Sequence, residues 1–204
     1  MLEIKNLCKS FGPNIILNDL SLILNRGEII YIHGRNGCGK STLLKIICDI
    51  LKPDQGDIIF DKDIYIGALI ENPGFIENES LSFNLKFLGS FRKKYDENKV
   101  IELCKQFDLD YYNKAKMKAY SVGMRQKVGI IQAIMENQDL IIFDEPTRGL
   151  DDESIETFEN MVNQLPKEGK SVIIASHDEL ENIHYHHKYL MKKGKLIKDE
   201  EISH

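Results

Sequence analysis

The chain has 204 residues, of which 42% are hydrophobic and 29% are charged, the usual balance of a globular protein with one well-cored domain. Its formal net charge of −5 disfavours nucleic acid as a partner, because proteins that bind nucleic acid usually present a basic face. The longest wholly apolar runs are about five residues, against the roughly 20 that span a bilayer, so we expect no membrane helix. The sequence starts without a basic-then-apolar leader, so we do not expect secretion.

The cysteines are scattered, with no CxxC pair and no regular spacing. This pattern predicts neither a metal site nor a disulfide framework. Free thiols suit a reducing compartment, so we expect the protein in the cytoplasm. The four cysteines are Cys8, Cys38, Cys48 and Cys104.

Apolar patterning in the first third of the chain predicts strands and one helix. Residues 2–7 alternate apolar and polar side chains, as a half-buried strand does. From residue 40 to 51 the apolar residues recur at helical spacing, and Pro53 ends that predicted helix. The predicted strands are 2–7, 15–24, 28–32, 57–60 and 64–70.

Beyond residue 70 the pattern is mainly helical until strands return. Short apolar runs at 140–143 and 171–175 are rich in β-branched residues and are typical of central parallel strands. The helix predicted between them completes a βαβ unit, and Lys193-Gly194 predicts the turn of a closing hairpin at 188–197. The helical stretches are 80–109, a segment after Ser121, and 155–165.

A glycine-rich segment, GRNGCGKS at 34–41, follows one predicted strand and opens a predicted helix. Its glycines allow several backbone N–H groups to point at one anion, and the helix N-terminus adds positive potential. Lys40 supplies a cation for the β- and γ-phosphates, and Ser41 supplies a hydroxyl for Mg²⁺. The segment predicts a nucleoside triphosphate site of the kind that kinases, GTPases and ATPases share.

Two carboxylates, Asp144 and Glu145, end a buried strand. The first can hold Mg²⁺ opposite Ser41, and the second can orient or deprotonate an attacking water. His177 follows the next strand, from which it can reach a γ-phosphate. Alone, the acids would be read as a solvated turn and the histidine as a surface residue; the phosphate loop favours the catalytic interpretation.

In chain order these segments resemble the motifs of ATP-binding cassette (ABC) ATPases. The phosphate loop matches the Walker A motif, and IIFDEP at 141–146 matches the Walker B strand. YSVGM at 120–124 resembles the family's signature, TRGLD at 147–151 its D-loop, and Ser176-His177 its switch histidine. The resemblance covers nearly the whole chain.

The resemblance implies the fold. It is an α/β P-loop NTPase core with a mainly parallel sheet, an N-terminal antiparallel β-subdomain and a helical insertion subdomain. We expect a single ABC ATPase domain at 1–204, with its core at 1–71 and 126–204 and the helical subdomain at about 72–125.

The resemblance also implies a role for each matching residue. Phe11 falls where the family has an aromatic ring that stacks on adenine. Glu145 would be the catalytic base, His177 would contact the γ-phosphate, and Glu71 would assist. The expected ATP-binding residues are Phe11, Gly34, Asn36, Gly37, Cys38, Gly39, Lys40, Ser41 and Thr42. The expected Mg²⁺ ligands are Ser41, Asp144 and Glu71.

The signature segment implies a composite site. Ser121, Gly123 and Met124 would contact the ATP of the opposite subunit, and Asp151 belongs to the D-loop. Ser121 is also suited to cap the helix that follows it, which is the structural alternative.

The chain departs from the usual family pattern at Glu71 and in its spacing from Lys40, and the form of the Glu71 segment indicates a subgroup of the family. Glu71, in the segment IGALIENPGF at 66–75, replaces the usual glutamine, and only 31 positions separate it from Lys40. A carboxylate accepts hydrogen bonds but donates none, and it carries a charge. This form and the YSVGM signature resemble export or immunity cassettes of the lantibiotic and bacitracin type.

Several other residues receive a structural interpretation. Phe83, Phe87 and Phe91 are expected in the core, with a groove for a partner's helix as the alternative. Cys38 is expected to fill space in the phosphate loop, although its position predicts inhibition by thiol reagents. The histidines expected on a surface helix or turn are His184, His186 and His187.

The resemblance therefore implies an ATP-hydrolysing subunit of a transporter. Two cassettes, identical or different, would close head to tail around two ATP molecules and drive a separately encoded transmembrane permease. That permease would be the only link to the membrane, and the cargo would be an antimicrobial peptide or drug. The alternatives are an ABC ATPase without a permease, serving cofactor assembly, and a regulatory protein that binds ATP without turnover.

Overall fold

The structure, a computed structural model, describes residues 1–61, 63–92 and 94–199. The last five residues of the predicted domain, 200–204, lie outside this description. Two β-sheets organise the described chain: a small antiparallel sheet and a larger, mainly parallel one. Among the described residues, no helix is both long and apolar enough to cross a bilayer.

The small sheet is antiparallel throughout and has the strand order β2-β1-β4. Alternation explains its first strand, in which Leu2 and Ile4 are buried while Lys5 is exposed. Strands were predicted in all three places, so this sheet confirms the expected N-terminal antiparallel unit. Its strands are β1 (Leu2–Phe11), β2 (Asn14–Leu24) and β4 (Gln55–Phe60).

The large sheet has the order β5-β6-β7-β3-β8-β9. Its first five strands run parallel, and β9 is antiparallel to β8. Every residue of β6 and β7 is buried, which accounts for their continuous apolar sequences. The strands are β3 (Ile29–His33), β5 (Ile66–Leu69), β6 (Leu140–Asp144), β7 (Ser171–Ala175), β8 (His187–Lys192) and β9 (Lys195–Lys198).

The β8–β9 hairpin turns at Lys193-Gly194, as predicted. The φ angles of these residues are 52° and 75°, as a two-residue turn that follows the twist of the sheet requires. Gly194 also touches β2: its carbonyl oxygen accepts the Asn18 N–H at 2.9 Å, and a Cβ on Gly194 would lie 2.7 Å from the Ile16 oxygen. The hairpin is therefore fastened to the small sheet.

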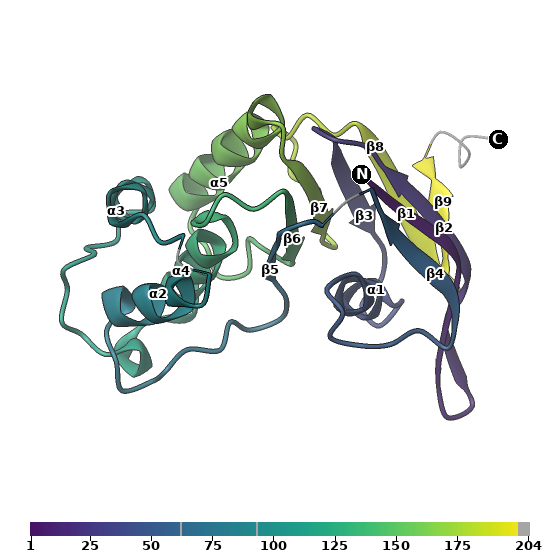
Figure 1. Ribbon diagram of the computed structural model, residues 1–204, viewed down its shortest axis with the longest axis horizontal. Coiled ribbons are helices and arrows are strands. Elements are labelled where there is room, and N and C mark those ends of the chain that lie inside the picture. The colour runs from purple at the N-terminus through teal and green to yellow at the C-terminus, as the bar shows by residue number, and fades with distance from the viewer. Residues whose placement is uncertain (62, 93, 200–204) are drawn as a thin grey trace.

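Helices lie on both sides of the large sheet (Figure 1). On one side α1 packs together with the small sheet; on the other side lie α2 to α5. Side chains alternate between the two faces along β3. Ile30 and Ile32 lie in the hydrophobic core shared with α1 and the small sheet, and Ile29 and Tyr31 lie in the core shared with α2 to α5. The helices are α1 (Lys40–Ile47), α2 (Leu81–Ser90), α3 (Glu97–Gln106), α4 (Val122–Ile134) and α5 (Asp152–Gln164).

Helix α1 ends earlier than its apolar spacing predicts. Asp49 adopts a positive φ of 58° and donates its N–H to Ile46, while the Ile50 N–H bonds the Lys45 oxygen. These two bonds form a Schellman motif, which terminates the helix before Pro53 is reached.

The helical stretch predicted at 80–109 is two helices. Asp96 starts the second by accepting the N–H groups of Asn98 and Lys99 at its side chain. Because α2 and α3 are both amphipathic, the periodicity of the sequence does not reveal this break.

The core assignment of the phenylalanines on α2 and at its C-cap was wrong. Phe83, Phe87 and Phe91 are 45%, 43% and 70% exposed. Phe83 stacks on Phe87, which meets Phe91 edge to face, so the rings form an exposed aromatic stripe along α2.

Candidate functional site

The phosphate loop joins β3 to α1 through glycines in conformations that other residues rarely adopt. Gly34, Gly37 and Gly39 have φ angles of 152°, 78° and 114°. A Cβ on Gly34 would lie 2.6 Å from the Met191 oxygen of β8, so that position accepts no other residue without movement. The buried Lys40 donates its Nζ to the Gly34 oxygen at 2.8 Å, which brings its charge into the loop.

A cavity of about 450 Å³ lies over this loop. It contains most of the residues predicted to bind ATP, and Phe11, at the end of β1, forms part of its wall with a half-exposed ring. Ile16 also lines the cavity, and only its tertiary contact with Gly39 reveals it. The lining residues are Phe11, Ile16, Asn36, Gly37, Cys38, Gly39, Lys40, Ser41, Thr42 and Glu145.

Asp144 ends β6 and is only 3% exposed. Burial raises the pKa of its carboxyl group, and the charges of Glu145 and Glu71 raise it further, whereas Ser41 and Lys40 oppose them. Its Oδ1 atom is buried and has no hydrogen-bond partner among the described residues. Such an oxygen, beside the Ser41 hydroxyl, is suited to a cation.

Glu145 reaches across the carboxyl ends of neighbouring strands. Its Oε2 lies 2.7 Å from His177 Nδ1 and accepts the Ser176 hydroxyl at 3.0 Å, while its Oε1 lies 3.5 Å from Lys40 Nζ. Burial alone would raise the pKa of Glu145, but the bonds from His177 and Ser176 and the charge of Lys40 together lower it. The carboxylate is thus ionised at neutral pH.

The sheet order explains why these residues meet. The parallel strands β5, β6, β7 and β3 are neighbours, and the loops after them carry Glu71, Glu145, His177 and Gly34 respectively. The carboxyl ends of adjacent parallel strands lie at one edge of a sheet, where α/β proteins bind ligands. The structure therefore gathers residues that are more than 140 positions apart.

Glu71 points elsewhere than the sequence predicts. Its carboxylate pairs with Lys45 of α1 at 2.6 Å, one turn after Ser41, and the residue itself has a φ of 56°. It lines neither the phosphate-loop cavity nor the adjoining one that holds His177. The sequence contains no signal for this pairing.

The signature segment lies apart from the phosphate-loop cavity. Ser121 caps α4, accepting the Met124 N–H at 3.1 Å. A Cβ on Gly123 would lie 2.2 Å from the Gly149 oxygen, so the signature touches its own D-loop segment there. Ser121, Gly123 and Met124 do not line the cavity that contains Lys40.

Asp151 has a local structural contact. It caps α5 by accepting the Ser154 N–H at 2.8 Å, and it lies 3.5 Å from Lys127 of α4. The D-loop is therefore tied to both α4 and α5.

Gln126 is a functional candidate that the motifs do not single out. Its buried side-chain amide donates to the carbonyl oxygens of Glu145 at 3.0 Å and Pro146 at 2.9 Å. The only sequence signal is its place in the helix that begins with the signature.

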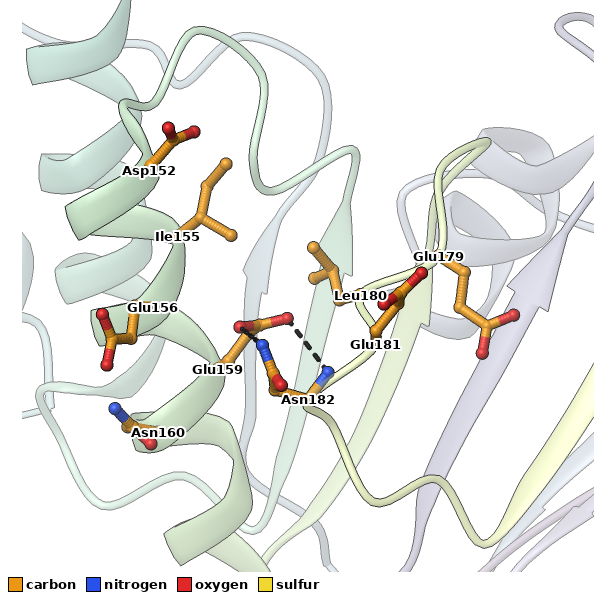
Figure 2. A pocket seen from close by; sticks show the side chains of 9 residues that line it. All are labelled: Asp152, Ile155, Glu156, Glu159, Asn160, Glu179, Leu180, Glu181 and Asn182. Carbon is orange, nitrogen blue, oxygen red and sulfur yellow. Dashed lines mark hydrogen bonds between the residues drawn. The ribbon is translucent and has the colours of Figure 1, made fainter.

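A hollow of about 530 Å³ lies between α5 and the segment after His177 (Figure 2). None of the predicted site residues lines this hollow. Across it, the Glu159 carboxylate accepts the backbone N–H of Asn182 at 3.3 Å and the side-chain amide of Asn182 at 2.8 Å. These bonds fasten the segment that follows His177 to α5. The lining residues are Asp152, Ile155, Glu156, Glu159, Asn160, Glu179, Leu180, Glu181 and Asn182.

Comparison with known proteins shows which sequences and structures this chain resembles. The family model described as ABC transporter matches residues 17–148. A lantibiotic transport ATP-binding protein, SrtF of Streptococcus pyogenes, is 32% identical and aligns with 98% of this chain and 91% of its own. The bacitracin transport ATP-binding protein BcrA of Bacillus licheniformis is 30% identical, over 100% of this chain and 71% of its own.

Two further comparisons concern length and fold. An uncharacterised ABC transporter ATP-binding protein of Bacillus subtilis, YdbJ, is 36% identical over 87% of this chain, which spans only 61% of that relative's length. The dimeric ATP-binding cassette MJ0796, solved in a post-hydrolysis state with ADP and phosphate, superposes with a TM-score of 0.86 at 25% identity, covering 98% of each chain.

Proposed function

Because this chain belongs to the ABC transporter family of ATP-hydrolysing subunits, we propose that it powers the export of an antimicrobial peptide or drug. The observation that carries the chemistry is the convergence of Lys40, Asp144 and Glu145 at one edge of the large sheet. The proposal for the cargo is supported by the lantibiotic and bacitracin relatives and by the Glu71 and YSVGM forms that this chain carries.

In this proposal the phosphate loop holds ATP. The backbone N–H groups of the loop and the start of α1 face the phosphates, and Lys40 neutralises their charge. The adenine stacks on Phe11, whose half-exposed ring shares a cavity with the loop. Asn36, Cys38 and Thr42 complete the lining.

The residues also fit Mg²⁺. Ser41 and Asp144 would hold it, because the buried Oδ1 of Asp144 has no partner among the described residues and hard cations prefer oxygen ligands. When bound, Mg²⁺ would neutralise charge that develops on the phosphates. Glu71 would join only by leaving Lys45, so we assign it to the rim of the site.

Glu145 is proposed as the base that takes a proton from the attacking water. Its lowered pKa keeps it ionised, and the bond from His177 Nδ1 fixes one carboxylate oxygen while leaving Oε1 near Lys40. His177 is more than half exposed, so its ring can also turn towards the γ-phosphate.

The second half of each site is proposed to come from another cassette. Ser121 and Val122 are exposed and lie away from their own chain's phosphate loop, as a segment that serves a neighbour's ATP must. In a head-to-tail dimer of two copies, one symmetry operation would create both sites. Asp151 and Met124 would lie beside that interface.

Besides the second cassette, the proposed partner is a separately encoded permease. The exposed aromatic stripe formed by Phe83 and Phe87 of α2 and by Phe91 at its C-cap offers an apolar face for a permease helix. The chain would then act at the inner face of the cell membrane through that contact, with 72–125 as its helical subdomain.

The test uses cells and purified protein together. A strain that lacks the gene should become sensitive to a lantibiotic or to bacitracin, and the wild-type gene should restore resistance. Glu145→Gln should fail to restore it and should release phosphate from ATP roughly 10²–10⁴-fold more slowly than wild type. Equal turnover by the two proteins would refute the assignment of the base, and unchanged sensitivity to both peptides would refute the proposed cargo.

A further inference from the structure

The amide of Gln126 connects α4 to the segment that carries Glu145. Gln126 is 4% exposed, and both bonds from its Nε2 end on main-chain oxygens, those of Glu145 and Pro146. A buried side-chain amide that donates to two successive carbonyl oxygens fixes the path of the backbone there rather than the position of a side chain.

The backbone that Gln126 bonds has an unfavourable conformation at Glu145. Glu145 has a φ of 48°, a left-handed conformation that a non-glycine residue adopts only when its surroundings impose it. Its N–H donates to the Ala175 oxygen of β7 at 2.8 Å, and its carbonyl oxygen accepts from Gln126. The backbone of Glu145 is therefore held by β7 on one side and by α4 on the other.

The same helix carries the signature. Ser121 caps α4, and Gln126 follows five residues later in the same continuous helix. Between them Gly123 lies against Gly149, just beyond the residues that Gln126 bonds. A displacement of the start of α4 would move Gln126 with it, because a helix this short behaves as a rigid rod.

We infer that Gln126 is a positioning residue that sets the backbone of Glu145, and that it transmits movement of the signature to the base of the same chain. This inference rests on the proposed function. In the dimer, Ser121 would contact the ATP of one site while Glu145 acts at the other, so Gln126 would link the two sites through a single protomer.

The test is Gln126→Met, which keeps the length and volume of the side chain but removes both donors. We expect kcat for ATP hydrolysis to fall roughly tenfold while KM for ATP changes less than about twofold, since the loss affects the base and not the nucleotide contacts. Gln132→Met is the matched control on the same helix, because the carbonyl oxygens of Glu145 and Pro146 accept from Gln126, whereas Gln132 Oε1 has no hydrogen-bond partner among the described residues; it should leave kcat unchanged.

A second measurement separates positioning from folding. In the Glu145→Gln background, where ATP persists, Gln126→Met should leave ATP-dependent dimer formation, followed by size-exclusion chromatography, unchanged. If Gln126→Met abolishes dimer formation or unfolds the protein while Gln132→Met does not, the role is structural and the inference is overturned.

The failure of this inference is distinguishable from failure of the proposed function. If Gln126→Met hydrolyses ATP as fast as wild type while Glu145→Gln does not, the inference fails and the proposed base stands. If Glu145→Gln also hydrolyses at the wild-type rate, the proposed function fails first.

Discussion

At the end of β6, the carboxyl group of Asp144 lies buried, and its Oδ1 bonds to no other described group. Burial raises its pKa above the ordinary value. A group whose pKa is raised on folding loses stability as the pH rises through the folded pKa, so ionised Asp144 destabilises the free protein at neutral pH. The residue is retained, in our proposal, because it holds a cation.

We therefore predict that Asp144→Asn stabilises the nucleotide-free protein at pH 7. The gain should be roughly 0.5–2 kcal/mol, a rise in Tm of about 2–4 °C per kcal/mol for a domain of this size. It should shrink as the pH falls towards about 4 and approach zero only below about 3, where an aspartate is protonated in both the folded and the unfolded state. Thermal denaturation between pH 4 and 8 measures this; a gain that is constant with pH would contradict it.

Lys45 and Glu71 form an exposed ion pair, and such pairs contribute little to stability. Its consequence is electrostatic: Lys45 compensates a negative charge that raises the pKa of nearby Asp144. Without Lys45, the Glu71 carboxylate would repel a phosphate ligand.

Lys45→Met should therefore raise KM for ATP, by roughly two- to tenfold at low ionic strength, and the double variant with Glu71→Gln should recover the wild-type KM. Steady-state phosphate release at a fixed magnesium concentration gives these values. If the double variant keeps the raised KM of Lys45→Met, then Lys45 does not act by compensating the charge of Glu71.

At the scale of the element, α4 combines a structural cap with a proposed trans contact. Ser121 accepts the Met124 N–H, which stabilises the helix whatever the signature does. The two roles can be separated because aspartate caps a helix as well as serine does but repels phosphate.

Ser121→Asp should accordingly leave Tm within about 2 °C of wild type and preserve ATP binding by the monomer, while hydrolysis that depends on the dimer is lost. Calorimetry, binding of a fluorescent ATP analogue and phosphate release at rising protein concentration test the three parts. Unimpaired hydrolysis would show that Ser121 is only a cap.

The elements of this fold differ in how well the sequence reveals them. The strand β1 was predicted because alternation is a local property, and so is the Ser121 cap of α4. The Asp151 cap of α5 was not predicted. The end of α1 and the break before Asp96 were missed, because apolar spacing continues across both while backbone hydrogen bonds decide the ends.

The site shows the same division. Lys40, Ser41, Asp144 and Glu145 were predicted because each belongs to a short motif with a known geometry. Gln126 was not, because its importance comes from a contact with carbonyls 19 and 20 residues away. The exposure of Phe83 was missed because an aromatic at helical spacing looks the same in a core and on a docking face.

At the scale of the molecule, the order of strands in the large sheet differs from their order in the chain, and this brings the residues of the candidate site together. Strand β3 lies beside β7, although more than 130 residues separate them. The large sheet also divides the interior into two cores, one shared with the small sheet and one with α2 to α5. The residues proposed to bind the nucleotide follow the carboxyl ends of neighbouring strands of this sheet.

The β8–β9 hairpin has a consequence for the order in which the protein matures on the ribosome. Gly34 lies against the Met191 oxygen, and Gly194 lies against Ile16, which in turn touches Gly39. The phosphate loop is translated early, yet two of its glycines depend on residues near the end of the described chain, directly or through Ile16. A nascent chain whose hairpin is not yet synthesised lacks these contacts, so we expect it to bind ATP more weakly than the finished domain.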